Sequence, residues 1–119
     1  MNHLVTTTLF LMVIMGLSAQ EMSTGIWLTG EENTKIETYE KQGVWYGKIK
    51  SSDNPKAKIG IDILKGFHLV DGKWEGQLYA AKRSKYFDAV IDPSNNVLHI
   101  TVTAGLVKKK LTWSKEDED

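Results

Sequence analysis

Apolar and polar residues alternate with a period of two along most of the chain after residue 24. This period is typical of β-strands with one buried face, whereas a helix repeats every 3.6 residues. The segment 97–104 is the clearest case, because Leu98, Ile100, Val102 and Ala104 share one face. The pattern predicts about eight short strands and favours no helix, since Gly60 and Gly66 weaken the one alternative, a helix over 61–69. The predicted strands are 25–29, 35–40, 44–50, 58–64 continued by 67–70, 73–80, 85–91, 97–104 and 106–114.

Short turn signals separate these strands. Gln42-Gly43 and Asp71-Gly72 predict tight hairpins, and 92–96 predicts a turn because Pro93 presets its backbone angle. The segment 51–58 predicts a surface loop, with a mobile flap as the alternative. Ile59, Ile61 and Ile63 predict one buried strand face.

Consecutive hairpins fit two all-β folds, a closed antiparallel up-and-down barrel or a two-sheet sandwich. We favour the barrel because glycines at 47, 60 and 76 suit the bends that closure demands. A barrel also removes exposed strand edges. Trp27, two residues after Gly25, is expected to plug one end, and Trp113 lies on the last strand.

The N-terminus resembles an export signal. The uncharged apolar run 9–17 is too short to span a bilayer, which takes about 20 residues, and Ser18-Ala19 offers a cleavage point. We predict that 1–19 is a signal peptide cut after Ala19, that 20–119 is one domain without a stable membrane span, and that it is periplasmic or secreted. Because no Lys or Arg precedes the run, an uncleaved anchor helix is the alternative.

Composition excludes several kinds of chemistry. The chain has no cysteine, so thiol catalysis, disulfides and zinc–thiolate sites are impossible. Lys plus Arg and Asp plus Glu both number 15, which gives no overall field that favours nucleic acid. The lysines at 108–110 and the acidic residues at 116–119 fit a solvated edge and a frayed chain end.

Catalytic and metal-binding patterns are also missing from the sequence. His68 and His99 form no close metal-binding pair, no serine sits in a Gly-x-Ser-x-Gly elbow, and no glycine-rich phosphate loop occurs. We therefore predict no enzyme activity, no metal and no cofactor.

The aromatic residues are the remaining signal, and they support two hypotheses. Either the rings line a cavity for a small hydrophobic or amphiphilic ligand, or they fill the barrel, which then acts as an envelope or surface module through protein contacts. The second hypothesis predicts an exposed apolar or aromatic patch. The candidate ligand-binding residues are Trp45, Phe67, Trp74, Tyr79, Tyr86, Phe87 and His99. The possible polar anchors, if their faces turn inward, are Tyr46, Tyr79, Tyr86 and His99.

Several segments resemble, in their order, the DUF2147 family of exported bacterial proteins. They are 25–29, 46–49, the Ile-rich strand before 64–67, 74–79 and 111–115. The resemblance implies a small lipocalin-like β-barrel with an internal cavity and no established activity. The Gly25-x-Trp27 opening also resembles the lipocalin signature, which implies that Lys115 meets the Trp27 ring at the barrel floor, so that Gly25, Trp27, Trp113 and Lys115 close the barrel.

Overall fold

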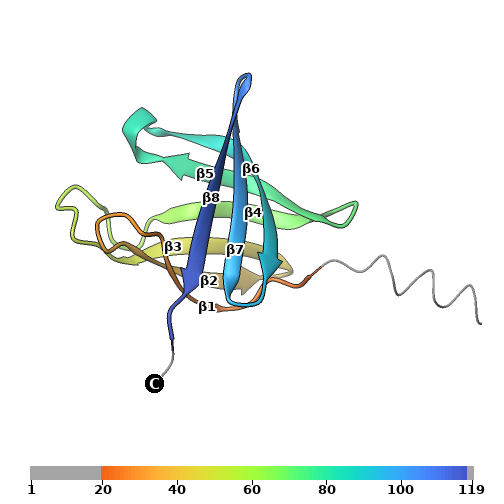
Figure 1. The fold of residues 1–119 in the computed structure, drawn as a ribbon, viewed down its shortest axis with the longest axis horizontal. Helices are drawn as coiled ribbons and strands as arrows, with labels where there is room; N and C mark the ends of the chain where they lie inside the picture. Colours follow the sequence, from red (N-terminus) through yellow and green to blue (C-terminus); the bar gives the residue numbers. More distant parts are fainter. Residues whose placement is uncertain (1–19, 118–119) are drawn as a thin grey trace, which may run out of the picture.

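The computed structural model describes residues 20–117, and the predicted signal peptide lies outside the described residues. The described chain forms one closed barrel in which each strand pairs antiparallel with its neighbours in sequence, and β1 pairs with β8 (Figure 1). This confirms the predicted up-and-down barrel over the sandwich. The strands are β1 (Gly25–Leu28), β2 (Lys35–Lys41), β3 (Val44–Ser51), β4 (Asp62–Val70), β5 (Lys73–Ala80), β6 (Lys85–Ser94), β7 (Val97–Ala104) and β8 (Val107–Lys115).

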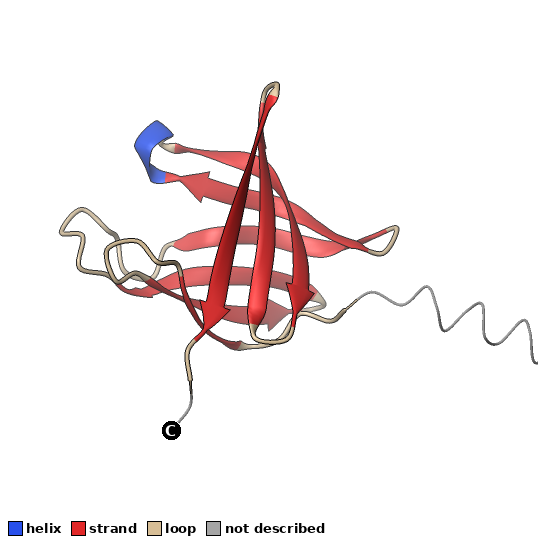
Figure 2. Ribbon diagram, viewed as in Figure 1, coloured by secondary structure: helices blue, strands red, loops and turns tan. Residues whose placement is uncertain are grey.

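The remainder of the described chain is turns and loops. Figure 2 shows a short 3₁₀ turn, Ala81–Arg83, between β5 and β6. No helix within residues 20–117 has the length and apolar character that crossing a membrane would require.

The predicted hairpins form with the expected backbone geometry. Gln42 and Gly43 have φ of 51° and 80°, and Asp71 and Gly72 have φ of 49° and 79°. Positive φ at both central residues is the mark of a type I′ turn, whose twist matches that of the flanking strands. These two turns therefore fix the registers of β2 with β3 and of β4 with β5.

The predicted strand 58–64 is wrong in its first half. β4 begins at Asp62, and Ile59 is 63% exposed. Ile61 and Ile63 are only partly buried, so the predicted buried isoleucine face is also wrong, and Leu64 and Phe67 are the buried residues of this strand. Gly60 has a φ of +92°, which turns the chain, and its N–H donates to the Ile49 carbonyl at 2.8 Å outside a regular ladder. Period-two spacing alone could not reveal this interruption. The predicted turn 92–96 is also shorter, because β6 continues to Ser94 and leaves only Asn95 and Asn96 outside the strands.

Side chains fill the interior of the barrel. The inward faces of the strands carry a continuous apolar cluster that includes all four tryptophans. A Cβ added at Gly76 would lie 2.7 Å from the Phe67 ring, and one at Gly47 would lie 2.9 Å from both Ile36 and Leu64. These glycines are needed because no space for a methyl group remains beside them. The buried apolar residues are Met22, Trp27, Ile36, Trp45, Ile49, Leu64, Phe67, Trp74, Leu78, Ala89, Ile91, Leu98, Ile100, Val102 and Trp113.

The segment 20–24 covers one end of the barrel, which we call the N-terminal end. Met22 is 6% exposed there and belongs to the core cluster. The Trp74 indole Nε1–H donates to the Gln20 carbonyl at 2.8 Å. The start of the described chain is thus held across the mouth of the barrel by the buried Met22 side chain and by hydrogen bonds to the Gln20 and Ser23 carbonyls.

Candidate functional site

The Trp27 indole plugs the N-terminal end from inside. The ring is 2% exposed, and its Nε1–H donates to Thr38 Oγ1 at 3.0 Å. The Thr38 hydroxyl in turn donates to the Ser23 carbonyl at 2.8 Å. A buried indole N–H needs such a partner, because an unpaired polar group in an apolar interior is costly. The relay joins β1, β2 and the segment that covers the barrel end.

Lys115 meets the Trp27 ring, as the lipocalin-like opening implies. Its Nζ lies 6.0 Å from the ring centroid, within the range of a cation–π contact. Gly25 makes room for the lysine stem, since a Cβ there would lie 2.9 Å from Lys115 Cε. Trp113 is buried opposite Leu98 in the β7–β8 ladder. The expected closure residues therefore lie at the same end of the barrel.

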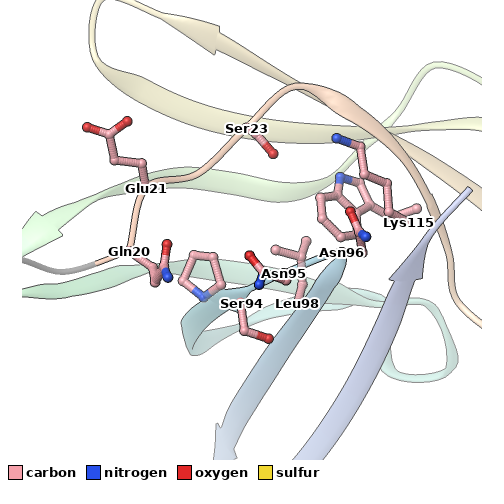
Figure 3. Close-up of a pocket in the computed structure, with 10 residues that line it drawn as sticks. Gln20, Glu21, Ser23, Ser94, Asn95, Asn96, Leu98 and Lys115 are labelled. Atoms are coloured by element: carbon pink, nitrogen blue, oxygen red, sulfur yellow. The ribbon is translucent and has the colours of Figure 1, made fainter.

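A hollow of about 370 Å³ lies beside this plug (Figure 3). Trp27 and Leu98 are among its lining residues but are only 2% and 1% exposed, and most of the other lining residues are polar. In Figure 3 the Glu21 carboxylate points away from Lys115, which leaves the ammonium as the cation of the hollow. The lining residues are Gln20, Glu21, Ser23, Trp27, Pro93, Ser94, Asn95, Asn96, Leu98 and Lys115.

The residues predicted to bind a ligand do not converge. Trp45, Phe67 and Trp74 are packed in the core, at 8%, 0% and 9% exposure. Phe87 is partly buried near the opposite end, where Lys85 Nζ lies 5.0 Å from its ring centroid. Tyr79, Tyr86 and His99 lie on strand faces that turn outward. They therefore cannot act as polar anchors inside the barrel. None of these residues lines either hollow described here.

The other hollow, of about 500 Å³, is open and lies on the outer face of β4 to β7. A polar row crosses it, in which Lys65 is opposite Gln77, Gln77 opposite Asp88, and Asp88 opposite Thr103. Within residues 20–117, no group of three or more His, Asp or Glu side chains could hold a metal ion.

All four tyrosines lie on the outer face in two cross-strand pairs, which we call the tyrosine belt. Tyr39 stacks on Tyr46 with ring centroids 5.5 Å apart, and Tyr79 meets Tyr86 edge-on at 5.1 Å. Asp62 joins the pairs, because its Oδ1 accepts from the Tyr39 hydroxyl at 2.6 Å and its carbonyl accepts from the Tyr86 hydroxyl at 2.9 Å. The belt therefore ties β2 and β6 to the first residue of β4.

The hydrogen bonds to Asp62 lie where the sheet is least regular. The β3–β4 ladder shifts register twice, on either side of Gly47. Because the Tyr39 side chain reaches across β3 to Asp62, it supports a junction where fewer ladder contacts are available. Asp62 was not identified from the sequence as a candidate site residue. A bulge decides which face a residue joins, and spacing does not reveal a bulge.

Alkaline pH is expected to loosen the belt. Burial, and then the hydrogen bond to Asp62, raise the pKa of Tyr39 to about 12, and burial also raises the pKa of Tyr86. A raised pKa means that the folded state favours the neutral phenol. Its contribution to stability is therefore complete below about pH 10, the pKa of an unfolded tyrosine, and is lost as the pH rises towards 12.

The variant Tyr39→Phe tests this contribution by urea unfolding over the same pH range. We expect it to lower the free energy of unfolding by about 1 kcal/mol at neutral pH, the net value of one hydrogen bond, and to flatten the loss above pH 10. Tyr46→Phe is the matched control, because it keeps the stacked ring and leaves the Asp62 bond intact. Equal pH profiles for Tyr39→Phe and the unaltered protein would contradict the assignment.

Comparison with protein-family models, with curated proteins and with solved structures finds no match to this chain. The resemblance to the DUF2147 family therefore stays a prediction, and the functional argument depends on the geometry of the molecule itself.

Proposed function

We propose that the protein is an exported binding module that acts through the outer surface of a filled barrel, by contact with other proteins. The observation that supports this proposal most directly is the packing of the interior. Barrels of about eight strands either fill with side chains or hold one small ligand. Here the clashes that a methyl group would meet at Gly47 and Gly76 favour the filled state.

The outer surface offers what a protein-binding module needs. Aromatic residues are enriched at protein interfaces, and the tyrosine belt places rings on the outside. Large apolar side chains are exposed as well, most of all Leu106 at 104% and Val107 at 66%, both at the β7–β8 hairpin. These two neighbouring exposed apolar residues support the interaction hypothesis, which predicts an exposed apolar or aromatic patch.

The hollow at the N-terminal end favours a second function, the binding of a small amphiphilic ligand. Its volume of about 370 Å³ is at the lower end of the range of ligand pockets. An anionic head group would face Lys115, and an apolar portion would rest on Trp27 and Leu98.

A titration with laurate, followed by tryptophan fluorescence, separates the two functions. Because Trp27 lines the hollow, a bound molecule would change its emission. The interaction module predicts no saturable change up to the solubility limit of laurate. A saturable change that Lys115→Gln abolishes would establish the second function.

Photo-crosslinking in the producing cells tests the interaction module itself. A photoreactive benzophenone amino acid is placed at one exposed position at a time, namely Leu106, Leu69 or Ile59. We expect at least one position to give a discrete adduct with one protein, identified by mass spectrometry. The matched control replaces the exposed polar Lys82 on the turn between β5 and β6, from which no adduct should form. If every exposed position stays free of adducts, the proposal fails.

A further inference from the structure

For most of its length, strand β8 pairs with a neighbouring strand on one side and not on the other. β7 pairs with it from Val107 to Ser114, whereas β1 pairs only with Ser114 and Lys115. Within residues 20–117, no other backbone hydrogen bond involves positions 107–113. Figure 1 shows the β7–β8 hairpin rising away from β1 and β2. The segment 107–113 is therefore a free strand edge on an otherwise closed barrel.

The side chains at this edge are apolar at the tip and basic next to it. Leu106 and Val107 are the two most exposed large apolar residues of the described chain. Lys108, Lys109 and Lys110 are all exposed. The ion pairs within residues 20–117 are Lys35–Glu116 and Lys48–Glu37, so none of these three lysines is neutralised by a described carboxylate.

We propose that the edge 107–113 accepts an extended acidic segment of a partner protein, which adds to the barrel as a further strand. The inference rests on the proposed function and names its surface and the chemistry of its partner. Added strands gain affinity from main-chain hydrogen bonds and specificity from alternate side chains. Glutamates or aspartates would face the lysines, and an apolar residue would cover Leu106 and Val107.

Charge argues against a second copy of this chain as the occupant. Full antiparallel overlap of 107–113 with its own copy would place Lys110 opposite Lys110, and like charges directly opposite each other destabilise a ladder. Lysines on an edge are a known protection against pairing with identical edges. The same charges attract an acidic strand, so they discriminate between the two kinds of partner.

The test uses the acetylated peptide Glu-Val-Glu-Thr-Glu-Val-Glu-Thr as the probe. It is titrated into the purified, ¹⁵N-labelled protein and followed by amide chemical shifts and hydrogen exchange. We expect saturable shifts and slower exchange confined to 107–113. Methylating alternate backbone nitrogens of the probe keeps its charge but removes donors, and should weaken binding at least tenfold.

A pair of charge variants completes the design. K108Q/K109Q/K110Q should weaken binding of the probe at least tenfold, whereas K56Q/K58Q/K73Q, which removes three exposed lysines elsewhere, should leave it unchanged. The inference is overturned if no peptide binds, if methylation has no effect, or if 107–113 is protected without peptide by dimerisation. Should crosslinks form only at Leu69 or Ile59, the interaction module would stand and this edge would not be its surface.

Discussion

Replacing Trp27 with alanine is expected to lower the free energy of unfolding by about 3–5 kcal/mol, the usual cost of removing a large buried aromatic side chain. The ring is 2% exposed and fills the N-terminal end of the barrel. Its loss also leaves Thr38, itself 1% exposed, without the indole donor. Because small domains have a total stability of about 5–15 kcal/mol, the variant approaches the limit of folding. Urea unfolding followed by circular dichroism measures the effect.

Two further variants separate the parts of this contribution. Trp27→Phe keeps most of the ring but loses the N–H, so it should be less damaging than alanine. Leu106→Ala should change stability by less than about 0.5 kcal/mol, because an exposed side chain has little packing to lose. A loss at Trp27 no greater than that at Leu106 would contradict the role of the indole as the plug.

Gly76→Ala is expected to lower the free energy of unfolding by about 1–3 kcal/mol through overpacking. A Cβ at this position would lie 2.7 Å from the Phe67 ring and 2.9 Å from the Lys65 carbonyl oxygen. Neither atom can move freely, since one belongs to a fully buried ring and the other to the backbone. Chemical denaturation of the two proteins side by side measures the difference.

Gly47→Ala is the matched control for this prediction. Its Cβ would meet the methyl ends of Ile36 and Leu64 at 2.9 Å, and the tip of a flexible side chain relaxes more readily than a ring or a carbonyl. We therefore expect a smaller loss at Gly47 than at Gly76. The double variant with Phe67→Leu should be less destabilised than the sum of the single changes, because Leu removes the clash. An unchanged stability for Gly76→Ala would refute the filled interior at this point.

The architecture could be predicted from sequence because the alternation of apolar and polar residues and the turn residues between the strands indicate the same fold. Alternation selected the inward faces, such as that of Leu98, Ile100 and Val102, and the Gln42-Gly43 turn set a hairpin register. Of the three glycines predicted to lie inside strands, Gly47 and Gly76 do, whereas Gly60 lies in a turn before β4. The failure at Ile59 occurred where a glycine with positive φ turns the chain although the apolar spacing continues.

The candidate site was harder to predict because it depends on contacts across strands. Period two divides a strand into two faces, but it does not say which face is inside where both faces carry large side chains. Tyr79 and Tyr86 were therefore considered as anchors within the barrel. The observed division is simple: the tryptophans lie inside and the tyrosines lie outside, where their hydroxyls reach water or Asp62. Similarly, Met22 belongs to a segment with no alternation, so only the fold reveals its place in the core.

The meeting of β1 with β8 has a consequence for synthesis of the molecule. These are the first and last strands of residues 20–117, and their contacts through Trp27 and Lys115 join residues 88 positions apart in the sequence. The ribosome synthesises the chain from its N-terminus, so the barrel cannot close until β8 has emerged. The nascent chain therefore exposes apolar surface throughout translation. Contacts between such distant residues also slow folding, because a long loop of chain must close before they form.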